Sequence, residues 1–363
     1  MLKPKTRFSN LSNLFLPLSV LAILIIINLI KGADYFRITV VNGAFYGNIP
    51  NILFGASELV ILSVGMTLVT AASRGQDISI GESGAISSAI FVQYVLRSGN
   101  VTLWTILVGF LISCVAGIVI GAFNGTLVSF FNVQPMVATL ILFLGGRSIA
   151  FIIDGKVSPI LANEISNRIG TVIPGVPIQT PIILTAVFIV LVAMVLKATN
   201  LRLYVEAVGI NPSAARLNGI NPKRVIFLTF LIMGVCSAIA GFIAVNKAGR
   251  HDSVNLLKFI MMDAILAVAL GGNSLGGGRF SITGSILGAY TIEMLNRTLL
   301  RLEVNPEAIK VFKAVFIIVL MIVASPVVRA FVTQALDKAK SIIAGSPLRQ
   351  TGGTADATGR KGE

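Results

Sequence analysis

Charged residues are scarce in this chain. Lys, Arg, Asp and Glu together make up 12% of its 363 residues, whereas 55% are hydrophobic, and the mean hydropathy is +0.89. Because soluble domains carry about a quarter charged residues, this composition excludes a soluble enzyme or a soluble binding module. It predicts instead an all-α polytopic membrane protein.

Acidic residues are particularly few. There are 15 Asp and Glu against 29 Lys and Arg, which gives a net charge of +14. A basic excess is typical of nucleic-acid-binding domains, but the apolar bulk of this chain leaves no soluble domain to carry such a face. We therefore expect no nucleic-acid partner, and expect the basic residues to flank membrane segments on the cytosolic side.

Residues suited to catalysis or metal binding are scarce as well. The single histidine, His251, falls in a predicted exterior loop, and the sequence has no Cys, His and acidic residues at metal-ligand spacing. The two cysteines, Cys114 and Cys236, lie inside apolar runs and are expected to be buried thiols rather than a disulfide or a metal pair. The sequence therefore predicts neither a metal site nor a catalytic site.

Apolar segments recur along the chain and predict about ten membrane helices, some of them short or broken. A straight crossing takes about 20 apolar residues, and most segments approach that length. Segments 85–96 and 260–270 are short; they are interpreted as half-helices, re-entrant pieces, or helices extended by polar residues along a water-filled path. The predicted segments are 14–30, 52–72, 85–96, 101–123, 136–153, 182–196, 225–245, 260–270, 282–300 and 311–328.

The ends of the chain and its basic residues set the predicted orientation. No small-x-small cleavage site follows residue 30, so the first segment is interpreted as an uncleaved membrane helix rather than a signal peptide. The Lys and Arg bias is small overall and rests on the loop 198–224 and the tail. We expect a cytosolic segment 1–13, a transmembrane domain 14–330 and a cytosolic, partly disordered tail 331–363.

A short helix with both ends specified is predicted inside the polar loop 206–224. Asn211 is a favourable N-cap, Pro212 suits the first helical position, and Gly219 can adopt the left-handed conformation that ends a helix. A second Asn-Pro pair, at 221–222, then starts the next apolar run. A loop that only joined two membrane helices would not need a helix of its own, so we expect another protein to bind this one.

An apolar helix is interrupted between residues 73 and 81. The break contains Gln76, Asp77 and Ser79. A break of this type exposes backbone groups and places a carboxylate beside them. Asp77 is therefore expected either to cap the following helix or to form part of a gate or translocation path.

Further ionisable residues lie in or near the apolar segments. Glu58 and Asp263 are inside them, and each is interpreted either as part of a polar pathway or as the structural partner of an arginine. Arg147, Glu293 and Arg297 lie near predicted helix ends. Scattered charges of this kind do not make a proton relay, so an ion-coupled pump is not predicted.

The glycine-rich stretch 271–279 could be taken for a phosphate-binding loop. It lacks the Gly-Lys-Ser/Thr ending and follows no predicted strand, so nucleotide binding is not favoured. We expect a tight turn in which glycines let two helix ends approach closely. Its Asn273 and Ser274 are further candidate residues of the translocation path.

The break at 73–81, the loop 206–224 and the glycine-rich stretch 271–279 follow one another along the chain. Together they resemble three segments of the membrane permease subunits of ribose-, galactose- and xylose-type sugar ABC importers, and the resemblance covers about residues 51–328. In segment 65–81 the matching residues include Asp77, Ser79 and Gly81. In the loop they are Ala207, Gly209, Asn211, Ala214, Ala215, Gly219 and Ile220. In the third segment they are 270–278, Gly284, Ser285, Gly288 and Ala289. The departures are Arg74-Gly75-Gln76 in place of small residues, Phe280 in place of glycine, and Glu58 in its helix.

The resemblance implies a subunit of a larger assembly with a type II ABC importer-like fold in a bacterial inner membrane. The implied partners are an ABC ATPase subunit, a second permease copy or paralogue, an external solute-binding protein and membrane lipid. No cofactor is expected in this chain, because ATP and Mg belong to the partner ATPase. The chain is accordingly expected not to be an enzyme.

The resemblance also implies that residues 206–220 couple the permease to the ATPase. The expected coupling residues are Glu206, Ala207, Gly209, Asn211, Pro212, Ala214, Ala215, Arg216 and Gly219. The small side chains of Ala214 and Ala215 would fit a groove on the ATPase. ATP binding would then move the short helix and shift the membrane helices between outward-open and inward-open states.

The function expected from these features is import of a monosaccharide or related polyol. A related permease for nucleosides or branched-chain amino acids is the alternative within transport. A secondary transporter without an ATPase is disfavoured by the capped loop, and a membrane enzyme is disfavoured because the sequence has no catalytic cluster. The sequence does not distinguish between sugars, nor between identical and different permease partners.

Overall fold

The computed structural model describes residues 8–41, 44–161, 163–305, 307–309 and 311–315. It divides into one compact unit, Met1–Phe312, and a second, Lys313–Glu363, of which residues 313–315 are described. Residues 1–7 of the predicted cytosolic segment, most of the predicted apolar segment 311–328, and the predicted tail 331–363 lie outside the described residues.

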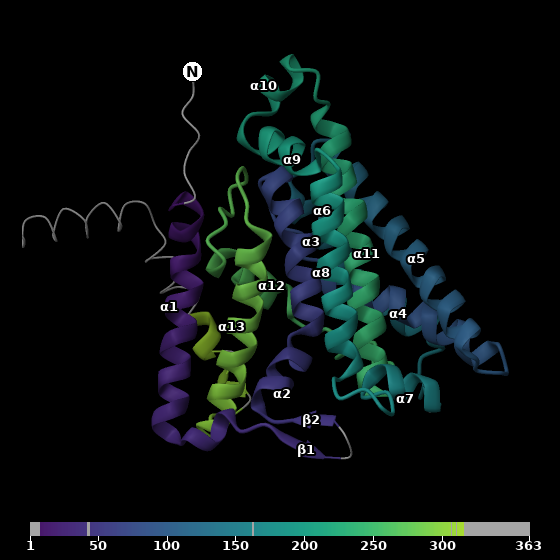
Figure 1. Cartoon of the computed structure of the whole chain (residues 1–363). Helices are drawn as coiled ribbons and strands as arrows, with labels where there is room; N and C mark the ends of the chain where they lie inside the picture. The colour runs from purple at the N-terminus through teal and green to yellow at the C-terminus, as the bar shows by residue number, and fades with distance from the viewer. Residues whose placement is uncertain (1–7, 42–43, 162, 306, 310, 316–363) are drawn as a thin grey trace, which may run out of the picture. The chain divides into compact units, whose positions relative to one another are not determined.

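The described part of the first unit is mostly helical, as Figure 1 shows. The long helices are α1 (Phe8–Lys31), α3 (Ser57–Ser73), α4 (Ile80–Arg97), α5 (Leu103–Ser129), α6 (Pro135–Ile153), α8 (Thr180–Ala198), α11 (Pro222–Ala248) and α13 (Ile282–Arg301). The shorter elements are η1 (Ala33–Phe36), α2 (Asn48–Gly55), α7 (Glu164–Gly170), α9 (Leu201–Ile210), α10 (Pro212–Leu217), α12 (Ile260–Leu270), β1 (Thr39–Val41) and β2 (Ala44–Tyr46). The helical fold class is confirmed. The antiparallel pair β1–β2, with Val40 opposite Phe45, is an addition that the sequence analysis did not predict.

Membrane-length helices account for part of the predicted topology. In the described residues α5, α6, α8 and α11 are long and apolar enough to cross a membrane, and α2 with α3, bent by 44° at their junction, makes a fifth candidate. The predicted number of ten crossings is thus not established by length and composition. The part of the chain that the structure describes fits a polytopic membrane protein with four or five candidate spans.

Of the two segments predicted to be short, one is part of a longer helix and the other is a short helix in the structure. Segment 85–96 belongs to the 18-residue helix α4, which begins at Ile80 and is extended by polar residues such as Glu82 and Ser83. Those two side chains are buried inside the protein rather than exposed to lipid. Segment 260–270 remains an 11-residue helix, α12, and Phe259 before it has a left-handed backbone conformation.

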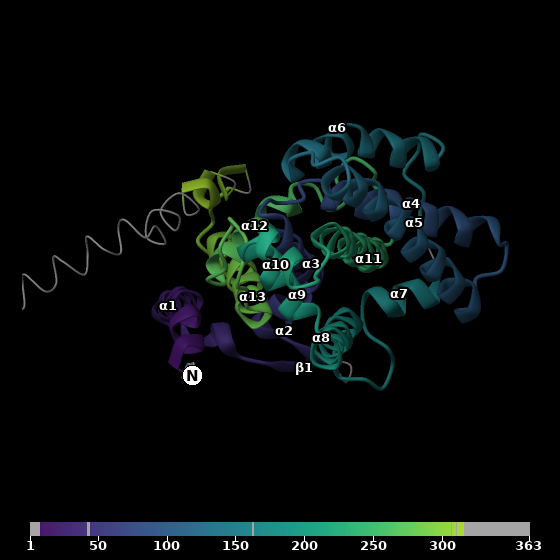
Figure 2. The ribbon, with the colours of Figure 1, turned by 90° about the horizontal axis from the view of Figure 1, so that it is seen from above.

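The core of the unit is built around α3. Every residue from Ser57 to Ala72 is buried, and seen from above the helix lies between α11 and the pair α12–α13 (Figure 2). Helix α11 also packs along α5, where Gly117, Gly121 and Gly125 recur at every fourth position on one face. Small residues at this spacing let two helix backbones approach closely without help from the hydrophobic effect.

The connecting segments gather at two ends of the unit. Helices α9 and α10 lie at one end (Figure 1), together with the turn 271–279, whose Gly278 bonds to the last turn of α3. We call this the α10 end. The strands β1 and β2 and helix α7 lie at the opposite end (Figure 1). Helix α1 begins toward the α10 end (Figure 1), which places residues 8–13 of the predicted cytosolic segment and loop 198–224 on the same side.

Local sequence explains the shape of the α10 region, and the predicted caps are confirmed. The side chain of Asn211 accepts hydrogen bonds from two backbone amides in the first turn of α10, and Asn221 accepts one from the first turn of α11. Gly219 has φ +79°, and the amide of Ile220 reaches back to the carbonyl oxygen of Ala215 at 3.1 Å. This is the left-handed helix stop that the glycine predicts.

Candidate functional site

The three sequence segments singled out above meet at the α10 end. The amide of Gly278 donates to the carbonyl oxygen of Ala71 at 3.0 Å. Gln76 Nε2 donates to the carbonyl oxygen of Leu275 at 3.0 Å. The end of α3 therefore contacts the turn 271–279 on one side, and through Arg74 it contacts α9. We call this meeting point, formed by 71–76, 209–210 and 275–279, the junction.

Arg74 joins α3 to α9 by two hydrogen bonds. Its Nε donates to the carbonyl oxygen of Gly209 at 2.8 Å, and its Nη2 donates to that of Ile210 at 2.7 Å. These carbonyls end α9, where the last C=O groups of a helix have no intrahelical donor. A cation there also interacts favourably with the helix dipole. Sequence reasoning noted Arg74 only as a departure from a family pattern and missed this role.

Gly209 is required by close backbone packing. A Cβ at this position would lie 1.9 Å from the carbonyl oxygen of Ala71 and 2.6 Å from the amide nitrogen of Gly278. Both neighbours are backbone atoms held by their own hydrogen bond, so neither can move aside easily. The predicted coupling residue Gly209 thus serves the contact between α9, α3 and the turn.

An open groove of about 590 Å³ lies at the junction. It is lined by Arg74, Gly209, Ile210, Gly276, Gly277, Gly278 and Arg279. The guanidinium of Arg279 is exposed and makes no hydrogen bond or ion pair with another described residue. The lining is therefore positively charged and contains no acidic side chain.

The predicted coupling residues are divided between two helices. Glu206, Ala207 and Gly209 belong to α9, and Glu206 pairs there with Arg202 at 3.0 Å. Pro212, Ala214, Ala215 and Arg216 form α10, between Asn211 and Gly219. Sequence reasoning did not identify α9 as a helix. The signal was present, because the buried residues Leu201, Val205 and Val208 follow helical spacing.

The two alanines of α10 have opposite environments. Ala214 is exposed, as are Arg216 and Leu217, and the Leu217 side chain is 89% exposed at the tip of the helix. Ala215 is only 4% exposed and packs in an apolar cluster with residues of α3, α9 and α11, including Val205 and Val225. The expectation that Ala215 faces a partner is therefore corrected, since it anchors α10 to the protein.

A small hydrogen-bonded group of Asp77, Ser79 and Asn124 stabilises the break after α3. Asp77 Oδ1 accepts from the amide and the hydroxyl of Ser79, at 2.9 and 2.7 Å, and Asn124 Nδ2 donates to Ser79 Oγ at 2.9 Å. The N-cap residue of α4 is Ser79, not Asp77. Asp77 therefore forms a turn just before α4, and the expectation that it caps the helix directly is wrong.

Glu58 has a lysine as its partner. Its Oε2 lies 2.8 Å from Lys247 Nζ, and the two side chains are 9% and 16% exposed. The same Nζ donates to the carbonyl oxygen of Phe54 at 2.9 Å and lies 4.2 Å from the centre of the Phe54 ring. These contacts support the structural interpretation of Glu58, with a lysine rather than an arginine as its partner.

Asn273 and Ser274 organise the turn between α12 and α13. Asn273 Oδ1 accepts from the amide of Ser281 at 2.6 Å, its Nδ2 donates to Ser285 Oγ at 2.8 Å, and Ser274 Oγ accepts from the amide of Gly276. The turn has three left-handed glycines, at 272, 277 and 278, so the predicted tight turn is confirmed. Asp263 lies half-buried in the first turn of α12.

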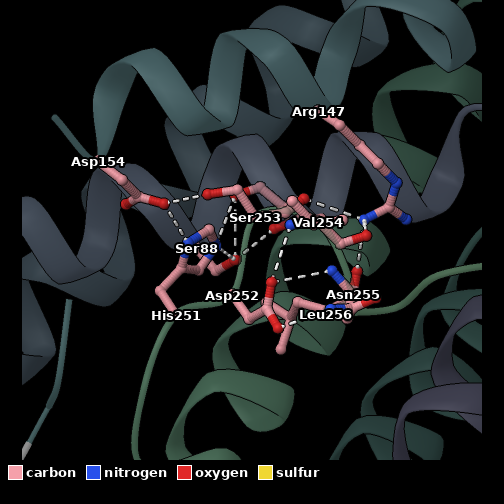
Figure 3. A network of polar contacts seen from close by, with 11 residues as sticks. Ser88, Arg147, Asp154, His251, Asp252, Ser253, Val254, Asn255 and Leu256 are labelled. Atoms are coloured by element: carbon pink, nitrogen blue, oxygen red, sulfur yellow. Dashed lines mark hydrogen bonds and ion pairs between the residues drawn. The ribbon is translucent and has the colours of Figure 1, made fainter. Parts of the chain in front are cut away.

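A buried ion pair that the sequence did not predict joins α4 and α6. Arg147 Nε lies 3.1 Å from Glu82 Oε1. Its Nη1 donates to three backbone carbonyls of the connection between α11 and α12, at 3.0 to 3.1 Å, as Figure 3 shows. The carbonyls belong to Ser253, Val254 and Leu256. Arg147 thus fixes this connection against the two helices.

A buried Asp-His-Ser arrangement holds the same connection. His251 Nδ1 lies 2.6 Å from Asp154 Oδ2, and its Nε2 lies 3.0 Å from Ser88 Oγ (Figure 3). The order resembles that of a serine hydrolase triad. However, the Ser88 hydroxyl bonds to the Gly84 carbonyl of its own helix, and all three side chains are buried. The group is therefore structural, and His251 is not the surface residue that an exterior loop implies.

Both cysteines are free thiols. Cys236 is buried beside Gly65, as predicted, whereas Cys114 is half-buried.

Comparison with known proteins agrees with the three-segment resemblance. Residues 48–324 match the family described as branched-chain amino acid transport system / permease component. The fructose import permease protein FruF of Bifidobacterium longum is 36% identical over 78% of this chain and 79% of its own length. The galactofuranose transporter permease protein YtfT of Escherichia coli is 33% identical, over 89% and 92%. The ribose import permease protein RbsC of Escherichia coli is 31% identical, over 84% and 92%.

No solved structure matches the chain. The family match covers most of the chain and includes all three segments that form the junction. The relatives are permease proteins by name, and the apolar helices described above suit a protein embedded in a membrane. The chain therefore belongs to this family of ABC importer permeases, which includes the sugar import permeases named above.

Proposed function

We propose that this chain is the membrane-spanning permease subunit of an ATP-driven importer that carries a monosaccharide or related polyol. The observation that supports this most strongly is the similarity to permeases named for fructose, galactofuranose and ribose over most of the chain. An external solute-binding protein delivers the solute, and a second permease copy or paralogue completes the pathway. ATP and Mg are bound by a partner ATPase.

The geometry of α10 supports docking of that ATPase. The helix has six residues, is capped at both ends, and projects Ala214, Arg216 and Leu217 outward. A large apolar side chain that is 89% exposed at a helix tip loses unfavourable hydration when a partner covers it. Ala215 fastens the opposite face to the apolar cluster. Because α10 is capped and anchored in this way, a movement of the bound ATPase can displace the helix as a rigid unit.

The topology follows from the same assignment. The α10 end faces the cytosol of a bacterial inner membrane, both chain termini are cytosolic, and the fold is that of a type II importer with about ten membrane helices. Helical backbone is interrupted at the bend between α2 and α3, at Arg74 in the break before α4, and at Phe259 before α12. We expect these interruptions to lie within the membrane. Such backbone is tolerated where protein or a water-filled path satisfies it.

The docking proposal is tested by co-purification. The tagged chain is extracted in mild detergent, and its partners are identified by mass spectrometry. We expect an ABC ATPase subunit, present with the wild type and lost with Ala214→Arg. Ala198→Arg, which adds the same charge at an exposed position at the end of α8, is the matched control and should keep the ATPase. Purification of the wild-type chain without any ATPase, together with solute movement that needs no ATP, would establish a secondary transporter instead.

The family description supports one alternative solute class. It names branched-chain amino acid transport, so these amino acids belong in the same assay as the sugars. Saturable uptake of a monosaccharide that leucine does not inhibit is the expected result. Uptake of leucine, isoleucine or valine without uptake of any sugar would reassign the solute and leave the importer assignment unchanged.

A further inference from the structure

The pair α9–α10 is attached to the membrane helices in two ways. Apolar side chains, among them Val205, Val208 and Ala215, pack against α3 and α11. Apolar packing is not directional, so it allows small sliding and rotation. The two hydrogen bonds from Arg74 are directional. They hold the carbonyls of residues 209 and 210, which directly precede Asn211, the N-cap of α10.

Along the chain, Arg74 is the first residue of the break between α3 and α4. Arg74 follows the last residue of α3 and has φ 58°, a conformation that arginine seldom adopts outside special turns. Gln76, two residues on, holds the turn 271–279 through the carbonyl of Leu275. Asp77 follows directly, and its carboxylate accepts a hydrogen bond from the hydroxyl of Ser79, the N-cap residue of α4.

The turn 271–279 also rests on the stem of Arg74. A Cβ on Gly277 would lie 2.7 Å from Arg74 Cγ and 3.1 Å from the carbonyl oxygen of Ala71. The backbone of Gly277, with φ +86°, therefore lies directly against the arginine side chain. A displacement of the arginine would reach the turn between α12 and α13 as well as the start of α4.

We propose that Arg74 is the positioning residue that transmits movement of α9 and α10 to the break between α3 and α4 and to the turn 271–279. The proposal rests on the function assigned above, in which an ATPase moves α10. The planar guanidinium suits this task because its donors have a fixed geometry and hold two adjacent carbonyls at once. When α10 moves, the segment 74–79 is carried with it, and α4 and α13 repack.

The test uses the complete importer, with its ATPase and solute-binding protein, in proteoliposomes that contain ATP. Solute uptake and ATP hydrolysis are measured in the same preparation, and their ratio is the readout. Arg74→Ala should keep the ATPase bound and active but lower uptake per ATP at least tenfold. Lys197→Ala, which removes another exposed positive charge at the end of α8, should leave the ratio unchanged.

A second variant keeps the test decisive if Arg74→Ala does not fold. Arg74→Lys retains the charge but lacks the fixed pair of donors, and it should lower uptake per ATP about threefold. A wild-type ratio in either folded variant would overturn the proposal. Loss of the ATPase from Arg74→Ala would also overturn it, since Arg74 would then be a docking contact. Absence of an ATPase from the wild-type complex would instead contradict the proposed function itself.

Discussion

Gly209 and Ala71 are so close that no side chain fits between them, because a Cβ on Gly209 would lie 1.9 Å from the Ala71 carbonyl oxygen. We therefore expect Gly209→Ala to separate α9 from α3. Overpacking of this kind costs about 1–3 kcal/mol. Thermal unfolding of the purified protein in detergent measures the loss as a lower Tm.

Gly145→Ala is the matched control for this substitution. Gly145 lies inside α6, and beyond the backbone of its own helix the added Cβ would have no heavy atom within 4 Å, so alanine should be neutral or slightly stabilising there. An unchanged Tm for Gly209→Ala would show that α9 is not fixed against α3 in the way described.

Replacement of Glu58 should destabilise the protein because of Lys247. Glu58→Gln leaves the ammonium group of Lys247 without its 2.8 Å carboxylate partner in a largely buried site. Breaking one side of a buried ion pair costs about 3–5 kcal/mol. The amount of folded protein and its Tm should fall together, with uptake lowered only in proportion.

The double variant Glu58→Gln/Lys247→Met separates the two interpretations of Glu58. Removal of both charges should restore much of the Tm, since neither charge is then left unpaired. Normal stability of the single variant with a specific loss of uptake would instead identify Glu58 as part of the translocation path.

Two neighbouring alanines should behave differently when each is replaced by arginine. Ala215→Arg forces a charge into the apolar cluster around Val205 and should prevent folding or lower the Tm strongly. Ala214→Arg lies on the exposed face and should keep the wild-type Tm while losing the ATPase. Equal melting of both variants would contradict the described packing of α10.

Acid should weaken the connection between α11 and α12 through Asp252. The hydrogen bond from the Asn255 side chain lowers the pKa of Asp252 in the folded protein, and two backbone amides of the same turn act in the same direction. As pH falls, the unfolded chain therefore takes up this proton first. The stabilisation is complete above about pH 4, the ordinary range of aspartate, and is lost below it.

Comparison of the wild type with Asp252→Asn isolates this contribution. The difference in Tm between the two proteins should be constant from pH 7 to about pH 5 and should shrink as the pH falls further. A difference that does not change with pH would show that the turn does not depend on the charge of Asp252.

The features that the sequence predicted correctly depend on neighbouring residues. Asn211, Pro212 and Gly219 define α10 because caps and stops act over three or four positions. The tight turn after α12 follows from its glycines in the same way. Helix α9 was missed because it has only ten residues, too few for a membrane segment, although its three buried positions follow helical spacing.

The features that the sequence did not reveal depend on distant residues. Glu82 and Arg147 are 65 positions apart, and Glu58 and Lys247 are 189 apart, so no local pattern connects them. The burial of Ala215 and of His251 likewise depends on packing against other helices. The contacts of Arg74 with α9 and with the turn 271–279 could not be predicted either, because these segments come together only in the folded chain.

The most direct measurement of the central claim is solute uptake by the reconstituted complex. Proteoliposomes with the chain, its ATPase and its solute-binding protein are supplied with a panel of labelled monosaccharides, with and without internal ATP. We predict accumulation of one sugar that requires ATP and is abolished by Ala214→Arg without loss of folded permease. Accumulation that is independent of ATP, or that persists in Ala214→Arg, would contradict the account.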